Sequence, residues 1–204
     1  MKYDMNKIPV IILAAGESKR MGIPKGLLNY QGKTFLSYQI DQVSNMGFSK
    51  IVVVLGKNEK IYQEKIPELK KHTIIVNPAP EKGQFSSIQC GLLSLSNVSQ
   101  SGAFILPIDV PCPDYDVWEQ LAIELLLSDA NVSIPEFQGK KGHPVLLSEE
   151  FKQHLLSCDS ESRLDFKIHK QIDEHKAKVI SVNDKNITLN INTLEEWKEY
   201  KVMQ

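Results

Sequence analysis

The chain of 204 residues has few cysteines, almost no net charge and no long apolar run. Its three cysteines, Cys90, Cys112 and Cys158, are odd in number and lack the paired short spacing of a zinc site or a disulfide framework, which indicates a reducing compartment. A formal net charge of -1 provides no general attraction for nucleic acid. The first apolar run, residues 8–13, is far shorter than the roughly 18 residues that span a bilayer. We therefore expect a cytoplasmic protein that acts on small molecules, with neither nucleic acid nor a membrane as partner.

Two common nucleotide-binding fingerprints are also missing. The dinucleotide pattern G-x-G-x-x-G does not occur, because no glycine stands at the required places between Gly16 and Gly22. The P-loop pattern fails on spacing, since five residues separate the two glycines that precede Lys33-Thr34, where about four are required. This near match also lacks a preceding apolar strand. A kinase or ATPase that uses Gly32-Lys33-Thr34 is kept as an alternative interpretation.

The sequence does contain strand-length apolar runs that alternate with segments of helical spacing. Residues 8–13 are continuously apolar, as in a strand buried on both faces of a parallel sheet. Residues 34–46 carry apolar side chains at helical spacing. We predict one α/β domain over residues 1–204, with a mostly parallel central sheet flanked by helices. Further strands are predicted at 51–55, 73–76 and 103–106, late strands that cap the sheet edge at 132–134, 145–147, 179–182 and 187–191, and further helices at 59–66, 85–95 and 115–127.

The segment after the first predicted strand, residues 13–26, reads LAAGESKRMGIPKG and combines small residues with basic ones. Small side chains at Ala14, Ala15 and Gly16 let the backbone approach a ligand, and backbone amides can donate to phosphate oxygens. Arg20 offers a planar fork for two oxygens, and Lys25 a mobile point charge. The segment therefore predicts a loop that holds a triphosphate, although an Ala-Ala-Gly turn after a strand can also be a simple connection.

Six motifs follow one another along the chain. They are L-A-A-G-x-S-x-R-M-G-x-P-K at 13–25, N-P-x-x-x-x-G-x-x-x-S at 77–87, I-x-x-G-L at 88–92, P-x-D-x-P at 107–111, G-H-P-V-L-L at 142–147 and N-I-N-T-x-E-E at 190–196. In this order the motifs resemble those of the molybdenum cofactor nucleotidyltransferase family, and most of all its cytidylyltransferases. The resemblance implies a single-domain Rossmann-like nucleotidyltransferase fold, similar to that of the nucleotide-diphospho-sugar transferases. It also implies that the loop at residues 13–26 grips the nucleotide.

Asp109 follows a predicted strand directly, at the edge where open α/β sheets bind ligands. A carboxylate is a ligand that Mg²⁺ prefers, and Mn²⁺ is the alternative cation. The resemblance implies Asn190 as the second metal ligand, with Asn192 as the fallback. An amide oxygen is a weaker ligand than the aspartate found in some family members. Alternatively, this segment only shapes the turn before a helix that begins near Leu194, with Thr193 as its N-cap.

The family resemblance also assigns the nucleoside side of the site. It implies that Gly83 and Ser87 face the nucleoside, at the start of a predicted helix, although serines there also serve as simple helix caps. The opening Leu-Ala-Ala-Gly resembles the cytidylyltransferases more than the guanylyltransferases, which makes CTP the first choice of nucleotide. The expected nucleotide-binding residues are Leu13, Ala14, Ala15, Gly16, Arg20, Lys25, Asn77, Gly83 and Ser87.

Two residues are candidates for binding the acceptor. The resemblance puts the segment around His143 on the acceptor side, and glycine-flanked, basic surroundings suit an anionic acceptor. A structural role for His143 is an equal alternative. Arg163 is the weaker candidate, because the D-x-G-A-R pattern of the molybdopterin cytidylyltransferases lacks its glycine and alanine here.

The expected reaction is attack by a phosphate oxygen of the acceptor on the α-phosphorus of the nucleotide, with pyrophosphate leaving. Catalysis would rest on positioning and on charge stabilisation by Lys25, Arg20 and the cation at Asp109. The expected acceptor is a small phosphorylated compound such as molybdopterin. A molybdoenzyme or its chaperone is the expected partner, and the protein is expected to be a monomer or a weak homo-oligomer. The alternatives are a GTP-using or sugar-phosphate nucleotidyltransferase and an inactive nucleotide-binding sensor or accessory protein.

Overall fold

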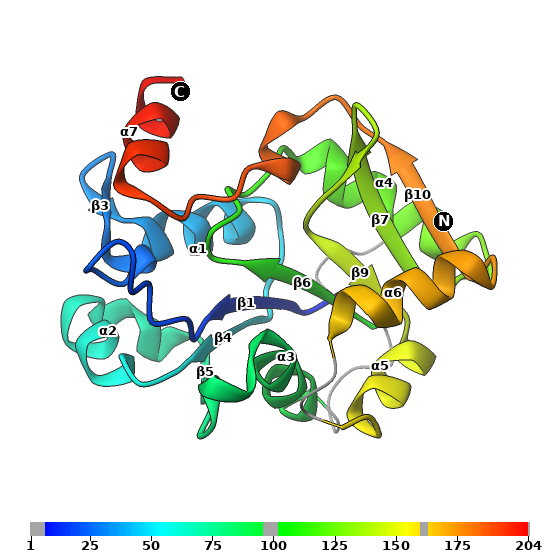
Figure 1. Cartoon of the computed structure of the whole chain (residues 1–204), viewed down its shortest axis with the longest axis horizontal. Helices are drawn as coiled ribbons and strands as arrows, with labels where there is room; N and C mark the ends of the chain where they lie inside the picture. The colour runs from blue at the N-terminus through cyan, green and yellow to red at the C-terminus, as the bar shows by residue number, and fades with distance from the viewer. Residues whose placement is uncertain (1–6, 96–101, 160–162, 204) are drawn as a thin grey trace.

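The computed structural model describes residues 7–95, 102–159 and 163–203, and an eight-stranded, mostly parallel sheet forms its centre. The strand order is β10-β7-β9-β6-β1-β4-β5, with β8 paired to β7 (Figure 1). Only β9 and β8 run antiparallel to their neighbours. The strands are β1 Val10–Ala14, β4 Ile51–Leu55, β5 Thr73–Val76, β6 Ala103–Pro107, β7 Val132–Phe137, β8 Lys140–Lys141, β9 Val145–Leu147 and β10 Ala177–Ser181.

The three central strands β6, β1 and β4 are continuous apolar runs because helices cover both of their faces. Successive side chains of a strand point to opposite faces. Val10, Ile12 and Ala14 accordingly belong to one core cluster, and Ile11 and Leu13 to the other. The sheet therefore separates two hydrophobic cores, as the apolar runs predicted.

The first core is covered by α1, α2, α4 and α7, and the second by α3, α5 and α6. Side-chain hydroxyls cap the starts of α1 and α5: Thr34 accepts from the Ser37 amide at 3.3 Å and Ser148 from the Phe151 amide at 3.1 Å. The helices are α1 Phe35–Asn45, α2 Glu59–Lys65, α3 Gln84–Leu93, α4 Tyr115–Leu126, α5 Glu149–Leu156, α6 Leu164–Asp173 and α7 Leu194–Met203.

The C-terminal helix α7 returns to the first third of the chain (Figure 1). There, β2 (Asn29–Tyr30) and β3 (Lys33–Thr34) form a separate two-stranded hairpin. The ring of Trp197 lies 5.7 Å from that of Tyr30 and 4.9 Å from that of Phe35, both in edge-on contacts. These contacts hold the segment before α7 beside the carboxyl ends of the central strands.

The prediction of a strand at 187–191 is wrong. Residues Lys185–Thr188 form a 3₁₀ helix, which begins where the Asp184 carboxylate accepts from the Asn186 amide at 2.8 Å. The Ile187 carbonyl accepts from the His143 amide at 2.9 Å, so this segment packs on residues 142–143 and joins no sheet. The helices α5 and α6 were not predicted. No helix in the described part of the chain combines the length and apolar character needed to cross a membrane.

Candidate functional site

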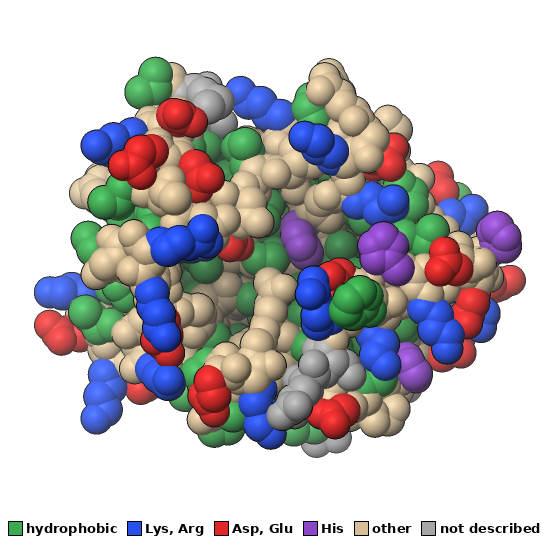
Figure 2. All heavy atoms as spheres, viewed as in Figure 1, with side chains coloured by type: hydrophobic (Ala, Val, Ile, Leu, Met, Phe, Trp, Pro, Cys, Tyr) green, Lys and Arg blue, Asp and Glu red, His purple; other side chains and the backbone are tan. Residues whose placement is uncertain are grey.

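A cavity of about 340 Å³ lies at the carboxyl ends of β1 and β6, the edge at which open α/β sheets bind ligands. In space-filling view this face is hollowed at its middle, with Lys and Arg side chains along the rims (Figure 2). The loop after β1 forms one wall, and the start of α3 forms another. The lining residues are Leu13, Ala15, Gly16, Ser18, Lys19, Arg20, Lys25, Pro80, Gly83, Gln84, Ser87, Pro107, Ile108, Asp109 and Asn192.

The loop after β1 is fixed at several points along its length. Ser18, with a positive φ of 51°, accepts at its Oγ from the Lys25 amide at 3.1 Å, which ties the two halves of the loop together. Met21 is buried in the first core. A Cβ on Gly56, at the end of β4, would lie only 2.4 Å from the Ala15 carbonyl oxygen. The hydrogen bond within the loop and the packing beneath it therefore fix its backbone.

A buried tyrosine holds the far end of this loop. Tyr62 of α2 accepts at its hydroxyl from the Gly26 amide at 3.2 Å. Burial raises the pKa of Tyr62 to about 12, so the hydroxyl stays neutral. The backbone at Lys25, the residue before Gly26, is therefore held in place.

The Lys25 ammonium lies at the centre of the site. Its Nζ donates to Asp109 Oδ2 and to Asn192 Oδ1, each at 2.9 Å. The side chains of Lys25 and Asp109 are only 13% and 24% exposed, so water screens this pair less than it screens a surface ion pair. Three distant segments of the chain therefore converge on one charged centre.

The end of the chain supplies Asn192, rather than Asn190, to this centre. The Ile191 amide donates to the Asp109 carbonyl at 2.8 Å, which fixes the segment beside β6. Asn192 is half-buried and lines the cavity, whereas Asn190 is exposed and accepts at its Oδ1 from Asn192 Nδ2 at 2.9 Å. Of the two asparagines considered as second metal ligand, Asn192 lines the cavity and Asn190 does not.

A reciprocal capping box holds Asn192 in position. The Glu196 carboxylate accepts from the amides of Asn192 and Thr193, at 2.6 Å and 2.9 Å, and Thr193 Oγ1 accepts from the Glu196 amide at 3.2 Å. The hydrogen bond from the Asn192 amide is the main cause that lowers the pKa of Glu196. The cap that explained this segment as a simple turn is present, and it also orients the amide that reaches Lys25.

The oxygen atoms at this centre, one from a carboxylate and one from an amide, are of the kind that bind a hard divalent cation. The Asp109 carboxylate and the Asn192 amide oxygen face the same cavity, and the ammonium between them shows that a cation suits both oxygens. Within residues 7–95, 102–159 and 163–203, no group of three or more His, Cys, Asp and Glu side chains could hold a metal by itself. Substrate oxygens and water would have to complete the coordination.

The nucleoside-side residues occupy two different positions. Gly83 and Ser87 line the cavity. Asn77 is buried outside it and donates from Nδ2 to Ser86 Oγ at 2.8 Å and to Ser87 Oγ at 2.9 Å. Asn77 therefore orients the serines at the start of α3, and Ser87 is the one that meets the cavity.

A second cavity of about 490 Å³ adjoins the first, and Gly83 and Gln84 line both. The two candidate acceptor residues, His143 and Arg163, lie here. Burial lowers the pKa of His143, against opposing contributions from the Asp109 charge and the Ile105 backbone, so the ring is neutral near pH 7. Arg163 forms an ion pair with Asp165. Residues 160–162, which precede Arg163 in the compared pattern, lie outside the described part of the chain.

The family of the chain follows from a family model, because the MobA-like NTP transferase domain matches residues 10–178. The chain belongs to this family. A molybdenum cofactor cytidylyltransferase of Escherichia coli (strain K12) is 30% identical over 145 residues, which cover 71% of this chain and 72% of that protein. A probable molybdenum cofactor guanylyltransferase of Bacillus cereus (strain AH187) is 24% identical over 200 residues, 95% of each chain.

Solved structures share the fold. The crystal structure of Rv0371c from Mycobacterium tuberculosis H37Rv has a TM-score of 0.81 at 19% identity and covers 97% of this chain and 99% of its own. A structure of Rv0371c in complex with manganese has a TM-score of 0.76 at 18% identity and covers 97% and 100%. The predicted family resemblance and the α/β nucleotidyltransferase fold are both confirmed.

Membership of the MobA-like NTP transferases makes the chain a nucleotidyltransferase by family. The near P-loop at Gly32-Lys33-Thr34 does not line the first cavity. Lys33 pairs instead with Asp41, and Thr34 caps α1. Ser18 and Gln84 are among the lining residues of the first cavity that received no role from the sequence. Ser18 stands inside the motif at residues 13–25, which was the available signal, whereas nothing in the sequence pointed to Gln84.

Proposed function

We propose that this MobA-like NTP transferase moves a nucleoside monophosphate, with CMP favoured, from the triphosphate to a small phosphorylated acceptor and releases pyrophosphate. One observation carries the proposal. The ammonium of Lys25, from the loop after β1, lies 2.9 Å from both Asp109 and Asn192 at the wall of a cavity of suitable size. Charge of this kind, held before the substrate arrives, is what stabilises a transferring phosphoryl group.

The residues around the cavity divide the work of the transfer. An acceptor phosphate is already ionised at neutral pH, so the attack needs no general base. The Lys25 ammonium, which pairs with the Asp109 carboxylate, is a mobile positive charge. It stabilises the negative charge that builds up on the leaving group during transfer. Arg20 is exposed on the same loop and has the planar fork that binds two phosphate oxygens. Ser87 and Gly83 face the space left for ribose and base.

The proposed cofactor is Mg²⁺ or Mn²⁺. Asp109 and Asn192 would hold it, and Asn190 would support Asn192 through the hydrogen bond between the two amides. A bound divalent cation neutralises charge on the triphosphate and on the departing pyrophosphate. The manganese in the structure of Rv0371c is in keeping with this choice, in a protein of the same fold.

CTP is the first choice of nucleotide because of the Leu-Ala-Ala-Gly opening of the loop and the similarity to the E. coli cytidylyltransferase. GTP is the alternative, since the B. cereus relative is a probable guanylyltransferase. Both relatives act on the molybdenum cofactor by name, which makes molybdopterin the first acceptor to test and a molybdoenzyme the first partner.

The test is a release assay with each of the four nucleoside triphosphates, Mg²⁺ and molybdopterin or a sugar phosphate as acceptor. Pyrophosphate and a nucleotidylated acceptor are expected with CTP, and chelation with EDTA should stop the reaction. Release of orthophosphate instead would contradict nucleotidyl transfer. The second candidate, a nucleotide-binding protein without turnover, is motivated by the single carboxylate and neutral amide at the cation site. It would give a CTP-dependent rise in melting temperature but no product with any acceptor.

A further inference from the structure

The turn that carries Asp109 has few backbone donors with which to hold itself in shape. Residues 107, 111 and 113 are prolines, and proline has no amide hydrogen. The Val110 amide closes the turn by donating to the Pro107 carbonyl at 3.1 Å. A buried backbone group without a partner costs free energy, so other parts of the chain have to bind the rest of this segment.

Gln39 of α1 supplies two of these hydrogen bonds. Its Nε2 donates to the Val110 carbonyl at 2.7 Å, and its Oε1 accepts from the Cys112 amide at 2.7 Å. Gln39 is fully buried on a helix face whose other buried side chains are mainly apolar. Burial of an amide side chain is tolerated when its hydrogen bonds are made, and both the nitrogen and the oxygen of Gln39 have partners. Gln39 therefore binds the backbone directly after Asp109.

The segment before α7 binds the same turn. The Ile191 amide donates to the Asp109 carbonyl at 2.8 Å, and Asn192 is the next residue. The Asp109 carboxylate and the Asn192 amide oxygen each accept from Lys25 Nζ at 2.9 Å, and both residues line the first cavity. A shift of the turn that Gln39 binds would therefore move both of these oxygens.

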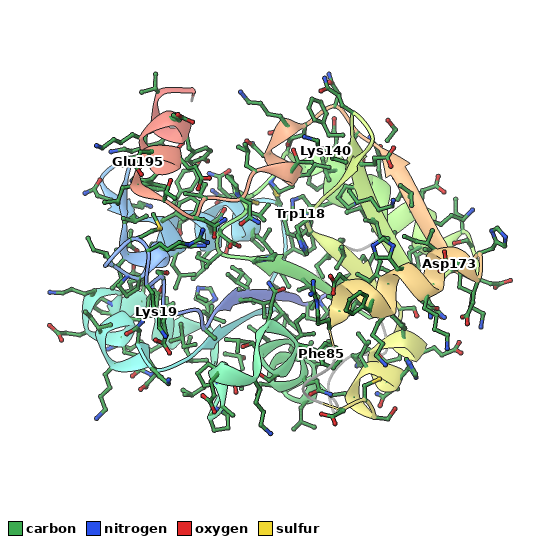
Figure 3. The ribbon with its side chains drawn as sticks, viewed as in Figure 1. Lys19, Phe85, Trp118, Lys140, Asp173 and Glu195 are labelled. Carbon is green, nitrogen blue, oxygen red and sulfur yellow. The ribbon has the colours of Figure 1, made fainter. Side chains whose placement is uncertain are left out.

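The end of the loop is held independently of Gln39. The indole of Trp118, a residue of α4 (Figure 3), donates from Nε1 to the Pro113 carbonyl at 3.2 Å. The Asp184 carboxylate accepts from the Asp114 amide at 2.8 Å. These contacts anchor the start of α4, so loss of the Gln39 hydrogen bonds should loosen the turn and leave the following helix in place.

We infer that Gln39 is a positioning residue of the cation site, which sets the place of the Asp109 carboxylate and, through the Ile191 contact, that of Asn192. Gln39 lines neither of the two adjoining cavities, so it acts through Asp109 and touches no substrate. Its role in cation binding rests on the proposed nucleotidyl transfer, whereas its hold on the Asp109 turn does not.

The hold on the turn is tested by amide hydrogen exchange in the full chain without ligand. Gln39→Met keeps the length of the side chain and removes both hydrogen bonds, whereas the control Val43→Ala loosens the core on the same helix. We expect the Ile191 amide, measured relative to the amides of β1, to exchange about tenfold or more faster in Gln39→Met than in Val43→Ala. Equal ratios in the two variants would overturn the inference. Gln39→Asn, one methylene shorter, decides in the same way if Gln39→Met does not fold.

The effect on the cation site is measured by electron paramagnetic resonance of free Mn²⁺ with CTP present. Gln39→Met should weaken Mn²⁺ binding by about tenfold or more, as loss of a group that orients a metal ligand does. Val43→Ala should leave Mn²⁺ binding unchanged, and both variants should bind CTP equally in EDTA. Unchanged Mn²⁺ affinity in Gln39→Met contradicts the positioning role. If the unmodified protein binds no CTP, only the nucleotidyl transfer is contradicted, because exchange of the Ile191 amide still decides whether Gln39 holds the turn.

Discussion

At the residue scale, the Lys25 ammonium touches both the carboxylate and the amide of the candidate cation site. Lys25→Ala should lower turnover by on the order of 10²-fold or more, as removal of one transition-state donor does. Pyrophosphate release measures the effect. The variant should still fold, because hydrogen bonds to the Ser18 and Tyr62 side chains hold the backbone at residues 25 and 26.

Lys19→Ala is the matched control for that variant. Lys19 is on the same loop, but its side chain is 81% exposed and pairs with Glu17. Its removal should change turnover much less, because an exposed and screened charge contributes little. Equal rates for Lys25→Ala and the unmodified protein would remove Lys25 from the mechanism.

The two asparagines give a second residue-scale prediction. Asn192→Asp should tighten Mn²⁺ binding in the presence of CTP by about tenfold, since a carboxylate is a stronger ligand than an amide oxygen. Asn190→Asp should have a smaller effect, because Asn190 is exposed and does not line the cavity. Electron paramagnetic resonance of free Mn²⁺ measures both affinities. A larger effect at Asn190 would reverse the assignment of the two residues.

These residues also show how far the sequence predicts the site. Lys25 and Asp109 were predicted from a loop and a strand end, because parallel strands bring their carboxyl ends to one edge. Asn190 was preferred to Asn192 from the resemblance alone, because the alternating pattern of Asn190, Ile191 and Asn192 puts both asparagines on the same face and cannot separate them. The geometry of this segment depends on the capping box at Glu196, which was predicted only as an alternative to a functional role.

At the element scale, the end of β4 packs directly beneath the loop after β1. A Cβ on Gly56 would lie 2.4 Å from the Ala15 carbonyl oxygen, so Gly56→Ala forces the loop or the strand to move. We expect a loss of about 1–3 kcal/mol in the free energy of unfolding, together with weaker CTP binding. Denaturant unfolding and calorimetry measure the two effects.

Gly16→Ala is the matched substitution within the loop itself. Apart from atoms of Gly16 and its two chain neighbours, no atom in the described part of the chain lies within 4 Å of the position that a Cβ would occupy, and the φ of Gly16 is not in the positive range. Stability should therefore stay within about 0.5 kcal/mol of the unmodified protein. A larger loss at Gly16 than at Gly56 would contradict the view that β4 supports the loop from below.

The accuracy of the element predictions follows their environment. The buried strands β1, β4 and β6 were predicted because both of their faces are covered and every residue is apolar. The helices α5 and α6 were missed because each buries only a narrow stripe, such as Phe151 and Leu155 of α5. Residues 187–191 were predicted as a strand from isolated apolar residues, which pack singly into the first core.

At the scale of the whole molecule, the sheet was predictable as mostly parallel, but its later half was not. The antiparallel β9 lies between β6 and β7, and this insertion depends on contacts between strands far apart in the chain. The same order brings the segment before β9, with His143, to the wall of the second cavity. The two adjoining cavities therefore arise from the sheet order, which apolar periodicity does not encode.

The return of α7 to the start of the chain leads to the last prediction. The family match ends at residue 178, yet α7 positions Asn192 through the cap in its first turn and anchors it through Trp197. Trp197→Ala should lower the free energy of unfolding by about 3–5 kcal/mol, since it empties a site 4% exposed between Tyr30 and Phe35.

Loss of the Trp197 anchor should reach the nucleotide site as well as the core. With the anchor gone, Asn192 is held less firmly against Lys25, and Mn²⁺ affinity with CTP present should fall. Val202→Ala, at a position 87% exposed on the same helix, is the control for both measurements and should change neither. Normal stability of Trp197→Ala would contradict the packing of α7, whereas lost stability with unchanged Mn²⁺ affinity would separate the helix from the site.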